Sequence, residues 1–268
     1  MYDLAALHSA LAGTVYSGKL HFFATTGSTN TEALEAARAG APHGSVFLAD
    51  EQTAGRGRGD HRWESEHGVG LYLSVLLRLP LAAAHLSLLP LAAGLAAADA
   101  IHTSTGVTID LRWPNDLLCG ERKAGGILVE SKLDGHALAF AVIGIGINVH
   151  QRRFSPALAT PATSLDLACG RPISRQALLL ALLKSLEHET QILCEDKAAR
   201  SLPARVEQHS SWLRGRRIEV HGPQACTGTT AGLDAHGFLR IETAHGMVTV
   251  QTGGIRAPEI NDSNAAGS

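Results

Sequence analysis

The sequence predicts an α+β protein in which a mixed β-sheet with flanking helices is followed by a small all-β module. Short apolar strand segments and longer helical segments alternate through most of the chain. After residue 213 only short strand segments remain, and glycine-rich turns separate them. This change in pattern predicts a boundary. We therefore expect a larger domain at 1–212, a β module at 213–258 and a flexible tail at 259–268.

The composition excludes several classes of protein. The 268 residues are 45 % hydrophobic and 18 % charged, which excludes wholesale disorder. With 23 basic and 25 acidic residues the net charge is −2, so no global field favours nucleic acid or an anionic membrane. The four cysteines lack C-x-x-C spacing, which excludes a disulfide framework.

No targeting or membrane segment is predicted. The first residues show no basic stretch followed by an apolar one, as a secretory signal peptide requires. The longest apolar run, from Leu79 to Ile101, is interrupted by Pro90 and Gly94 and predicts a buried helix instead of a membrane span. We therefore expect a cytoplasmic protein without a membrane partner.

The helix expected over 29–39 has clear start and stop signals. Thr29 and Glu32 have the spacing of a capping box, and Gly40 follows the last apolar position. Periodicity also predicts helices over 2–12 and 82–102 and strands over 20–24, 45–50 and 71–77. The segment Ala54–Gly70 is too long for an ordinary connection, so we expect a functional or mobile loop there.

From Thr108 the pattern is that of strands joined by short turns, with a hairpin signal at Asp134–Gly135. The expected strands cover 108–113, 116–119, 125–131 and 139–149. Helices over 175–194 and 202–213 follow. The β module is expected to contain strands over 217–220, 226–233, 238–243 and 247–251.

The segment Gly55–Trp63, GRGRGDHRW, is the most distinctive in the chain. Alternate glycines let backbone N–H groups approach a ligand, and the arginines offer planar donors for phosphate or carboxylate. Two other interpretations stay open: a solvated basic loop, or a single-stranded nucleic-acid site in which Trp63 stacks on bases. The single aromatic residue and the acidic Asp60, Glu64 and Glu66 disfavour nucleic acid.

Three further positions are candidates for chemistry. Asp116 lies beside Asn115 in a turn after a strand; this is either an ordinary turn or a station for Mg²⁺ and phosphate. Lys123 precedes Gly125–Gly126, where the missing side chains leave room for a ligand, although a lone lysine is more often a surface charge. Asn148 is either a turn-former or a ligand contact. The chain has no G-x-S-x-G or H-E-x-x-H motif, so serine-hydrolase and zinc-protease interpretations lack support.

Five motifs occur in a fixed order: GSTN at 27–30, QTAGRGRG at 52–59 with Trp63, RWPND at 112–116, ERKAGGILVE at 121–130 and GIGIN at 144–148. Together they resemble the biotin protein ligases, also called biotin–[acetyl-CoA-carboxylase] ligases. The resemblance implies that 1–212 is a catalytic domain with a fold like that of class II aminoacyl-tRNA synthetases. It also implies that 213–258 is an SH3-like β-barrel.

The resemblance implies a two-step reaction with biotin as substrate, ATP and Mg²⁺. The biotin carboxylate attacks the α-phosphate of ATP to give biotinyl-5′-AMP. A lysine of the biotin carboxyl carrier protein of acetyl-CoA carboxylase then attacks the mixed anhydride. Cations are needed to neutralise charge on the phosphate, and we expect the loop at about 54–67 to close over the adenylate and exclude water.

The resemblance also implies roles for individual residues. Lys123, Arg56 and Arg58 are the implied catalytic cations. The implied biotin contacts are Ser28, Thr29, Asn30, Gln52, Gly55, Arg56, Gly57, Arg58, Lys123 and Gly126. The implied ATP contacts are Arg58, Trp63, Asn115, Asp116 and Asn148, and Asp116 is the implied Mg²⁺ ligand.

The chain departs from the family pattern at three points. The variant residues Asp60, His61 and Arg62 alter the end of the loop motif, which leaves their roles open. Arg112 stands where the family commonly has lysine. About 20 residues precede the first expected strand, too few for a helix-turn-helix domain, so we expect no DNA partner. We expect a monomer or weak homodimer. The enzymatic alternative is a lipoate ligase or a lipoyl/octanoyl transferase, against which the GRGR loop favours biotin.

Overall fold

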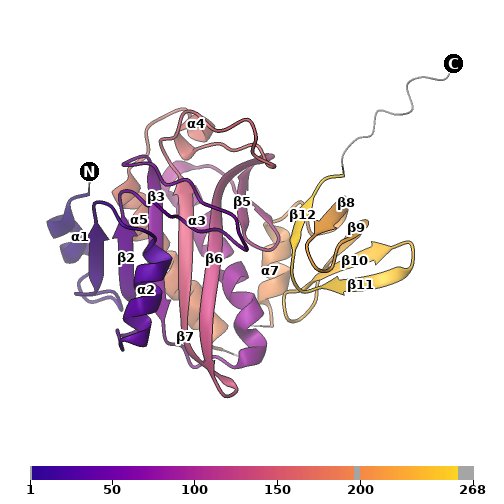
Figure 1. The fold of residues 1–268 in the computed structure, drawn as a ribbon, viewed down its shortest axis with the longest axis horizontal. Coiled ribbons are helices and arrows are strands. Elements are labelled where there is room, and N and C mark those ends of the chain that lie inside the picture. Colours follow the sequence, from indigo (N-terminus) through magenta and orange to yellow (C-terminus); the bar gives the residue numbers. More distant parts are fainter. Residues whose placement is uncertain (1, 196–199, 259–268) are drawn as a thin grey trace.

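The structure, a computed structural model, describes residues 2–195 and 200–258. The tail predicted at 259–268 lies outside the described residues. The described chain forms a seven-stranded mixed sheet with flanking helices and a five-stranded antiparallel sheet near its C-terminus (Figure 1). The predicted α+β class is confirmed.

The larger sheet has the strand order β1-β2-β3-β7-β6-β5-β4. β1 and β2 are parallel and every other neighbouring pair is antiparallel. β6 and β7 form a long hairpin around Gly135, as the Asp-Gly signal predicts. The strands are β1 (Leu20–Phe23), β2 (Ser45–Ala49), β3 (Gly70–Leu77), β4 (Asp110–Arg112), β5 (Asp116–Cys119), β6 (Arg122–Asp134) and β7 (Ala137–Asn148).

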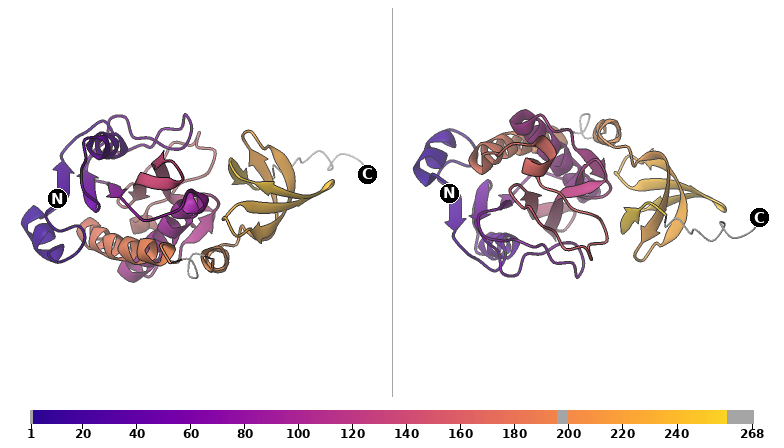
Figure 2. Two further views of the ribbon diagram at one scale, coloured as in Figure 1. Left: turned by 90° about the horizontal axis from the view of Figure 1, so that it is seen from below. Right: turned by 90° about the horizontal axis from the view of Figure 1, so that it is seen from above.

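Helices cover both faces of this sheet. α2 lies on one face, and α3 and α5 lie together on the other (Figure 2). The helices of the larger domain are α1 (Leu4–Ala10), α2 (Thr29–Arg38), the 3₁₀-helix η1 (Ala83–Leu88), α3 (Leu89–Thr105), α4 (Leu165–Cys169), α5 (Arg175–Leu193) and α7 (Leu202–Gln208). The motif-bearing loop between β2 and β3 lies on the α2 side of the sheet (Figure 1).

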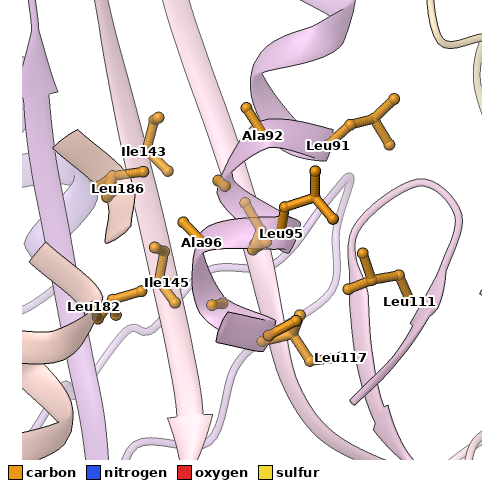
Figure 3. Packing of buried hydrophobic residues seen from close by; sticks show 14 of the residues in the cluster. Leu91, Ala92, Leu95, Ala96, Leu111, Leu117, Ile143, Ile145, Leu182 and Leu186 are labelled. Carbon is orange, nitrogen blue, oxygen red and sulfur yellow. The ribbon is translucent and has the colours of Figure 1, made fainter. Parts of the chain in front are cut away.

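Helix α3 forms the centre of the core. Figure 3 shows Ala92 and Ala96 beside Ile143 and Ile145 of β7, with Leu95 on the other side of the helix. The small alanines allow α3 to pack closely against both the sheet and α5. By length and composition alone the helical segment Ala83–Thr105 could span a membrane, but it is mostly buried inside this fold, as predicted.

Several predicted element boundaries are wrong; for example, β6 begins at Arg122 and β8 (Arg214–His221) at Arg214, each three residues before the predicted start. The helix expected over 82–102 is split, because Pro90 lies in the first turn of α3, where a missing N–H removes no helical hydrogen bond. That helix continues to Thr105 and ends at Gly106, whose φ is +78°. The helix expected over 202–213 ends at Gln208. The short helix α4 was not predicted.

The C-terminal sheet has the order β11-β10-β9-β8-β12. Its strands are β8 (Arg214–His221), β9 (Cys226–Leu233), β10 (Leu239–Thr243), β11 (Gly246–Val250) and β12 (Gly254–Arg256), of which β12 was not predicted. This module packs on the larger domain at the start of α3. There the indole N–H of Trp113 donates to the Gly237 carbonyl at 3.1 Å, and the Ser87 hydroxyl donates to the His236 carbonyl at 2.6 Å.

Candidate functional site

Glycines of the β6–β7 hairpin form the floor of the candidate site. Gly126 of β6 pairs with Gly146 of β7, and Gly144 lies two residues earlier on β7. A Cβ atom on Gly146 would lie 2.6 Å from the ring of Trp63, and one on Gly144 would lie 2.1 Å from Oδ1 of Asn30. Glycine is therefore required here so that two side chains can lie directly on the strands.

A cluster of hydrogen-bonded polar side chains, called the polar pocket below, lies at the start of α2, beside Gly144. The backbone N–H of Thr29 donates to Oε1 of Gln52 at 2.8 Å, and Nε2 of Gln52 donates to Oγ of Ser65 at 2.8 Å. The hydroxyl of Ser74 contacts Oγ1 of Thr29 at 2.8 Å and Oδ1 of Asn30 at 2.6 Å. Most of these groups are buried, so the pocket offers several fixed donors and acceptors to a ligand.

The capping box expected at the start of this helix does not form. Ser28 is the N-cap residue, and its side chain makes no capping hydrogen bond. Thr29 faces Gln52 and Ser74 instead, while Glu32 accepts a hydrogen bond from the Thr26 hydroxyl at 2.6 Å. The polar side chains that pattern analysis assigned to helix capping are thus used to build the pocket.

The loop between β2 and β3 folds back on itself as a small hairpin. The N–H of Gly57 donates to the His61 carbonyl at 2.7 Å, and the N–H of Trp63 donates to the Gly55 carbonyl at 3.0 Å. Gly59 lies at the turn with φ of +58°, which favours glycine. The variant residues at 60–62 lie at the exposed tip of this hairpin.

The two loop arginines predicted to be catalytic have different partners. Arg56 forms an ion pair with Glu130 of β6, and Asn30 donates to the same carboxylate oxygen at 2.9 Å. Arg58 Nη1 donates to the carbonyl of Gly253 in the C-terminal module at 2.8 Å and lies 3.5 Å from Oδ1 of Asn115. Burial lowers the pKa of Arg58, and the charge of Asp116 opposes that shift. Arg56 is therefore tied to the polar pocket, whereas Arg58 bridges to the module.

Lys123 lies close to the Asp116 carboxylate. Nζ of Lys123 lies 2.5 Å from Oδ1 of Asp116, and the guanidinium of Arg112 donates twice to Oδ2, at 2.6 and 3.1 Å. Burial raises the pKa of Asp116, but Lys123 and Arg112 lower it by more, so the net pKa lies below its usual value. The carboxylate is therefore an ionised partner that fixes the position of the lysine.

Trp63 completes the wall beside this lysine. Nζ of Lys123 lies 5.6 Å from the centroid of the Trp63 ring, a cation–π distance. A Cβ on Gly126 would be 3.4–3.5 Å from both side chains. Nε1 of Trp63 is buried and has no hydrogen-bond partner among the described residues. The ring, the ammonium group and the glycine floor thus meet at one place.

Asn148 and Asn115, both predicted to contact ATP, are committed to the protein backbone. Nδ2 of Asn148 donates to the Thr163 carbonyl at 3.0 Å, and Nδ2 of Asn115 donates to the Ile127 carbonyl at 2.7 Å. Lys123 pairs with the segment that Asn148 supports, because its N–H donates to the Pro161 carbonyl at 2.8 Å. In this structure the two asparagines fix the segments around Lys123.

The structure adds residues that pattern analysis missed. Ser65, Ser74 and Glu130 join the polar pocket, and Gly253 reaches the loop from the C-terminal module. Ser74 is the polar interruption of the apolar strand 71–77, a signal that was available in the sequence. Gly253 has no local signal, because its contact with Arg58 joins positions 195 residues apart.

Comparison with known proteins supports one family. The model described as the biotin/lipoate A/B protein ligase family matches residues 22–148. The chain is 35 % identical over 247 residues to the biotin–[acetyl-CoA-carboxylase] ligase of Mycobacterium tuberculosis, with 88 % of each chain covered. It is 32 % identical over 240 residues to the bifunctional ligase/repressor BirA of Bacillus spizizenii, with 85 % of this chain and 70 % of the relative covered.

A solved structure is similar over nearly the whole fold. The biotin protein ligase from Aquifex aeolicus in complex with biotin and ATP matches with a TM-score of 0.75 and 29 % sequence identity. The match covers 89 % of this chain and 98 % of that chain. The likeness therefore includes the C-terminal sheet as well as the larger domain.

Proposed function

The chain belongs to the biotin/lipoate A/B protein ligase family, and we propose that it is a biotin protein ligase, which activates biotin with ATP and transfers it to a carrier-protein lysine. The observation that carries this proposal is the position of Lys123. Its ammonium group lies beside a glycine floor and an aromatic wall, and a buried polar pocket lies next to them on the same strand. The site thus offers a polar end and a cationic end.

The geometry matches the chemistry of biotin. Gly144 and Gly146 are alternate residues of β7, so they lie on one face of the sheet about 7 Å apart. The ureido ring of biotin carries N–H donors and a carbonyl acceptor, which suit Thr29, Gln52 and their neighbours. The apolar chain would then run beside Trp63, which itself covers Gly146, and its carboxylate would reach Lys123.

Two chemical steps, adenylation and transfer, follow from this arrangement. A biotin carboxylate oxygen attacks the α-phosphorus of ATP, the bond to the bridging oxygen breaks, and pyrophosphate leaves. The carrier lysine amine then attacks the acyl carbon, AMP leaves with the bonding electron pair, and the amine loses a proton. Lys123, and Arg58 once it releases the Gly253 carbonyl, would stabilise the negative charge on the phosphate.

The protein residues do not fit a metal ion in this arrangement. Both oxygens of Asp116, the predicted Mg²⁺ ligand, are occupied by Lys123 and Arg112. Within 2–195 and 200–258, no group of three or more His, Cys, Asp or Glu side chains could hold a metal. We propose that any Mg²⁺ enters bound to the ATP phosphates, which are its usual partners in such sites.

The related activities are less well supported. A lipoyl group has no ureido N–H groups for the polar pocket, which favours biotin over a lipoate ligase or a lipoyl/octanoyl transferase. Arg56 and Arg58 are engaged within the site, which favours a ligase over a nucleic-acid module.

We propose that the acceptor is a carboxyl carrier protein of acetyl-CoA carboxylase. We also propose that the protein is a monomer or weak homodimer and that it acts in the cytoplasm, where ATP and the carrier are made.

The test is ATP–pyrophosphate exchange measured with biotin and lipoate in parallel. The proposal predicts exchange that depends on biotin and is absent with lipoate. Exchange with lipoate alone would support the related ligase. Steep weakening of nucleic-acid binding with salt, without any exchange, would support the nucleic-acid module.

A further inference from the structure

Trp212 lies at the junction between the larger domain and the C-terminal module. It follows α7 and comes two residues before β8, and 4 % of its surface is exposed. Neighbouring residues fix this junction to β4, because the Ser210 hydroxyl donates to the Leu111 carbonyl at 2.5 Å and the Ser211 N–H donates to Asp110 at 2.8 Å. The junction is therefore held rigidly beside the strand that ends at Arg112.

The Trp212 ring packs against two guanidinium groups. The guanidinium carbon of Arg216 lies 3.6 Å from the ring centroid, and that of Arg112 lies 5.2 Å from it. The indole nitrogen finds no hydrogen-bond partner in the described part of the chain. The contribution of Trp212 is therefore its aromatic ring, whose negative faces attract cations and whose plane suits a flat guanidinium.

Arg112 connects this ring to the lysine. Its guanidinium donates to Oδ2 of Asp116 through two nitrogens and to the Thr160 hydroxyl at 2.9 Å. Asp116 in turn holds Lys123 through its other oxygen. Because the Asp116 backbone is fixed in β5, holding one carboxylate oxygen restricts both side-chain torsions and so the position of the other oxygen.

Arg216 reaches the same lysine by a second route. Its guanidinium lies 2.6 Å from Oε1 of Glu121, which is in the β5–β6 turn two residues before Lys123. One route therefore holds the counter-ion of the lysine, and the other is an ion pair to a largely exposed side chain on the turn that carries the lysine. The first route starts from the contact between Trp212 and Arg112, the second starts from Arg216, and Trp212 and Arg216 are themselves in contact.

We propose that Trp212 and Arg216 are positioning residues that make the location of the Lys123 ammonium group depend on the seating of the C-terminal module. The inference rests on the proposed ligase function and specifies how adenylation depends on residues that do not touch the substrates. A misplacement of about 1 Å at a reacting group can reduce a rate by about 100-fold. Loss of the contact is therefore expected to lower kcat and leave the polar biotin pocket intact.

The experiment measures ATP–pyrophosphate exchange and biotin affinity in parallel for matched variants. Trp212→Leu removes the ring face, and Trp212→Phe keeps an aromatic face. Arg216→Gln removes the charge. Arg217→Gln is the control, because Arg217 is the exposed neighbour on β8 and its side chain forms no hydrogen bond, ion pair or ring contact within the described residues.

We expect kcat to fall about 10- to 100-fold for Trp212→Leu and about tenfold for Arg216→Gln, with biotin affinity, measured by calorimetry, within about twofold of the parent. Trp212→Phe is expected to retain most of the activity, and Arg217→Gln all of it. The losses of kcat caused by Arg216→Gln and Glu121→Gln should not add in the double variant, because each substitution removes the same Arg216–Glu121 ion pair.

Two results would overturn the inference while leaving the proposed function intact. One is parental kcat in Trp212→Leu and Arg216→Gln. The other is a loss of biotin affinity that equals the loss of kcat, which would indicate a general structural defect. If Trp212→Leu does not fold, the kcat values of Arg216→Gln, Glu121→Gln and their double variant decide whether the inference holds. Absence of biotin-dependent exchange in the parent chain would instead remove the proposed function.

Discussion

The ammonium group of Lys123 lies 2.5 Å from Oδ1 of Asp116, and Arg112 binds the other oxygen of the same carboxylate. The lysine is therefore held in place before any substrate arrives. Preorganised charge of this kind is effective in catalysis because no side chain has to reorient when charge develops. This relationship leads to the first two predictions.

Replacing Lys123 with alanine should abolish most of the activity and leave the fold nearly unchanged. Asp116 keeps its contact with Arg112 in this variant, so no buried charge loses its only partner. We expect exchange to fall about 100- to 1000-fold, the usual effect of removing one charge-stabilising donor. Near-parental exchange by purified Lys123→Ala would remove this lysine from the site.

Replacing Asp116 with alanine should reduce stability as well as activity. Arg112, which is 7 % exposed, would lose its charged partner. Removing one member of a buried ion pair costs about 3–5 kcal/mol. Urea unfolding should therefore show a much larger loss for Asp116→Ala than for Lys123→Ala. Equal stability of the two variants would contradict the described pairing.

Gly146 of the glycine floor should not tolerate a methyl group. A Cβ on Gly146 would lie 2.6 Å from the Trp63 ring, so Gly146→Ala should displace that ring. Overpacking of this kind costs about 1–3 kcal/mol of folding stability. Loss of the aromatic wall should in addition raise KM for biotin about tenfold, which is equivalent to about 1.4 kcal/mol of binding free energy. Gly94→Ala in α3 is the control, since its nearest contacts are ordinary at 3.5–3.9 Å and it lies outside the glycine floor. An equal KM for biotin in the two variants would contradict the proposed role of the floor.

Arg175 at the start of α5 should stabilise the base of the motif-bearing loop. Its guanidinium donates to Asp50 at 2.8 Å and to the Gly70 carbonyl at 3.1 Å, and these two residues flank the loop. Arg175→Leu leaves Asp50 buried without its partner, so we expect a loss of about 3–5 kcal/mol and faster proteolysis within the loop. Adding Asp50→Asn should recover part of the stability. Strictly additive losses in unfolding experiments would contradict this coupling.

Arg58→Gly should release the reactive adenylate. We propose that the loop closes over the adenylate, so that removing the half-buried Arg58 guanidinium would open the site to water and to diffusion of the mixed anhydride. Biotin labelling of added serum albumin should rise several-fold, whereas Arg62→Gly at the exposed loop tip should match the parent. Selective labelling by Arg58→Gly would contradict the proposed role of this arginine.

The fold was predictable wherever the signals were local. The Asp-Gly turn, the apolar strands and the alanine-rich helix are encoded within short windows, and the mixed sheet follows from them. Pro90 is a local signal for the start of α3 that the single-helix prediction did not use. The short elements α4 and β12 are too brief for periodicity to distinguish them from loops.

The candidate site was predictable from its motifs only in part. The motifs predict Lys123, Asp116 and the loop arginines as site residues, but they do not predict the partners of the arginines, because Glu130 and Gly253 approach Arg56 and Arg58 only through the tertiary fold. Thr29 shows the opposite case, since a valid local capping pattern is overridden by the contact with Gln52. The packing of the sheet determines which polar side chains from distant segments come into contact, and sequence patterns do not predict these contacts.

The most direct test of the central claim is a crystal structure of this chain with biotin and a nonhydrolysable ATP analogue. The account predicts that the ureido ring contacts Thr29 and Gln52, and that the carboxylate lies within hydrogen-bonding distance of Nζ of Lys123. Ligands bound away from the glycine floor, with Lys123 still facing only Asp116, would contradict it.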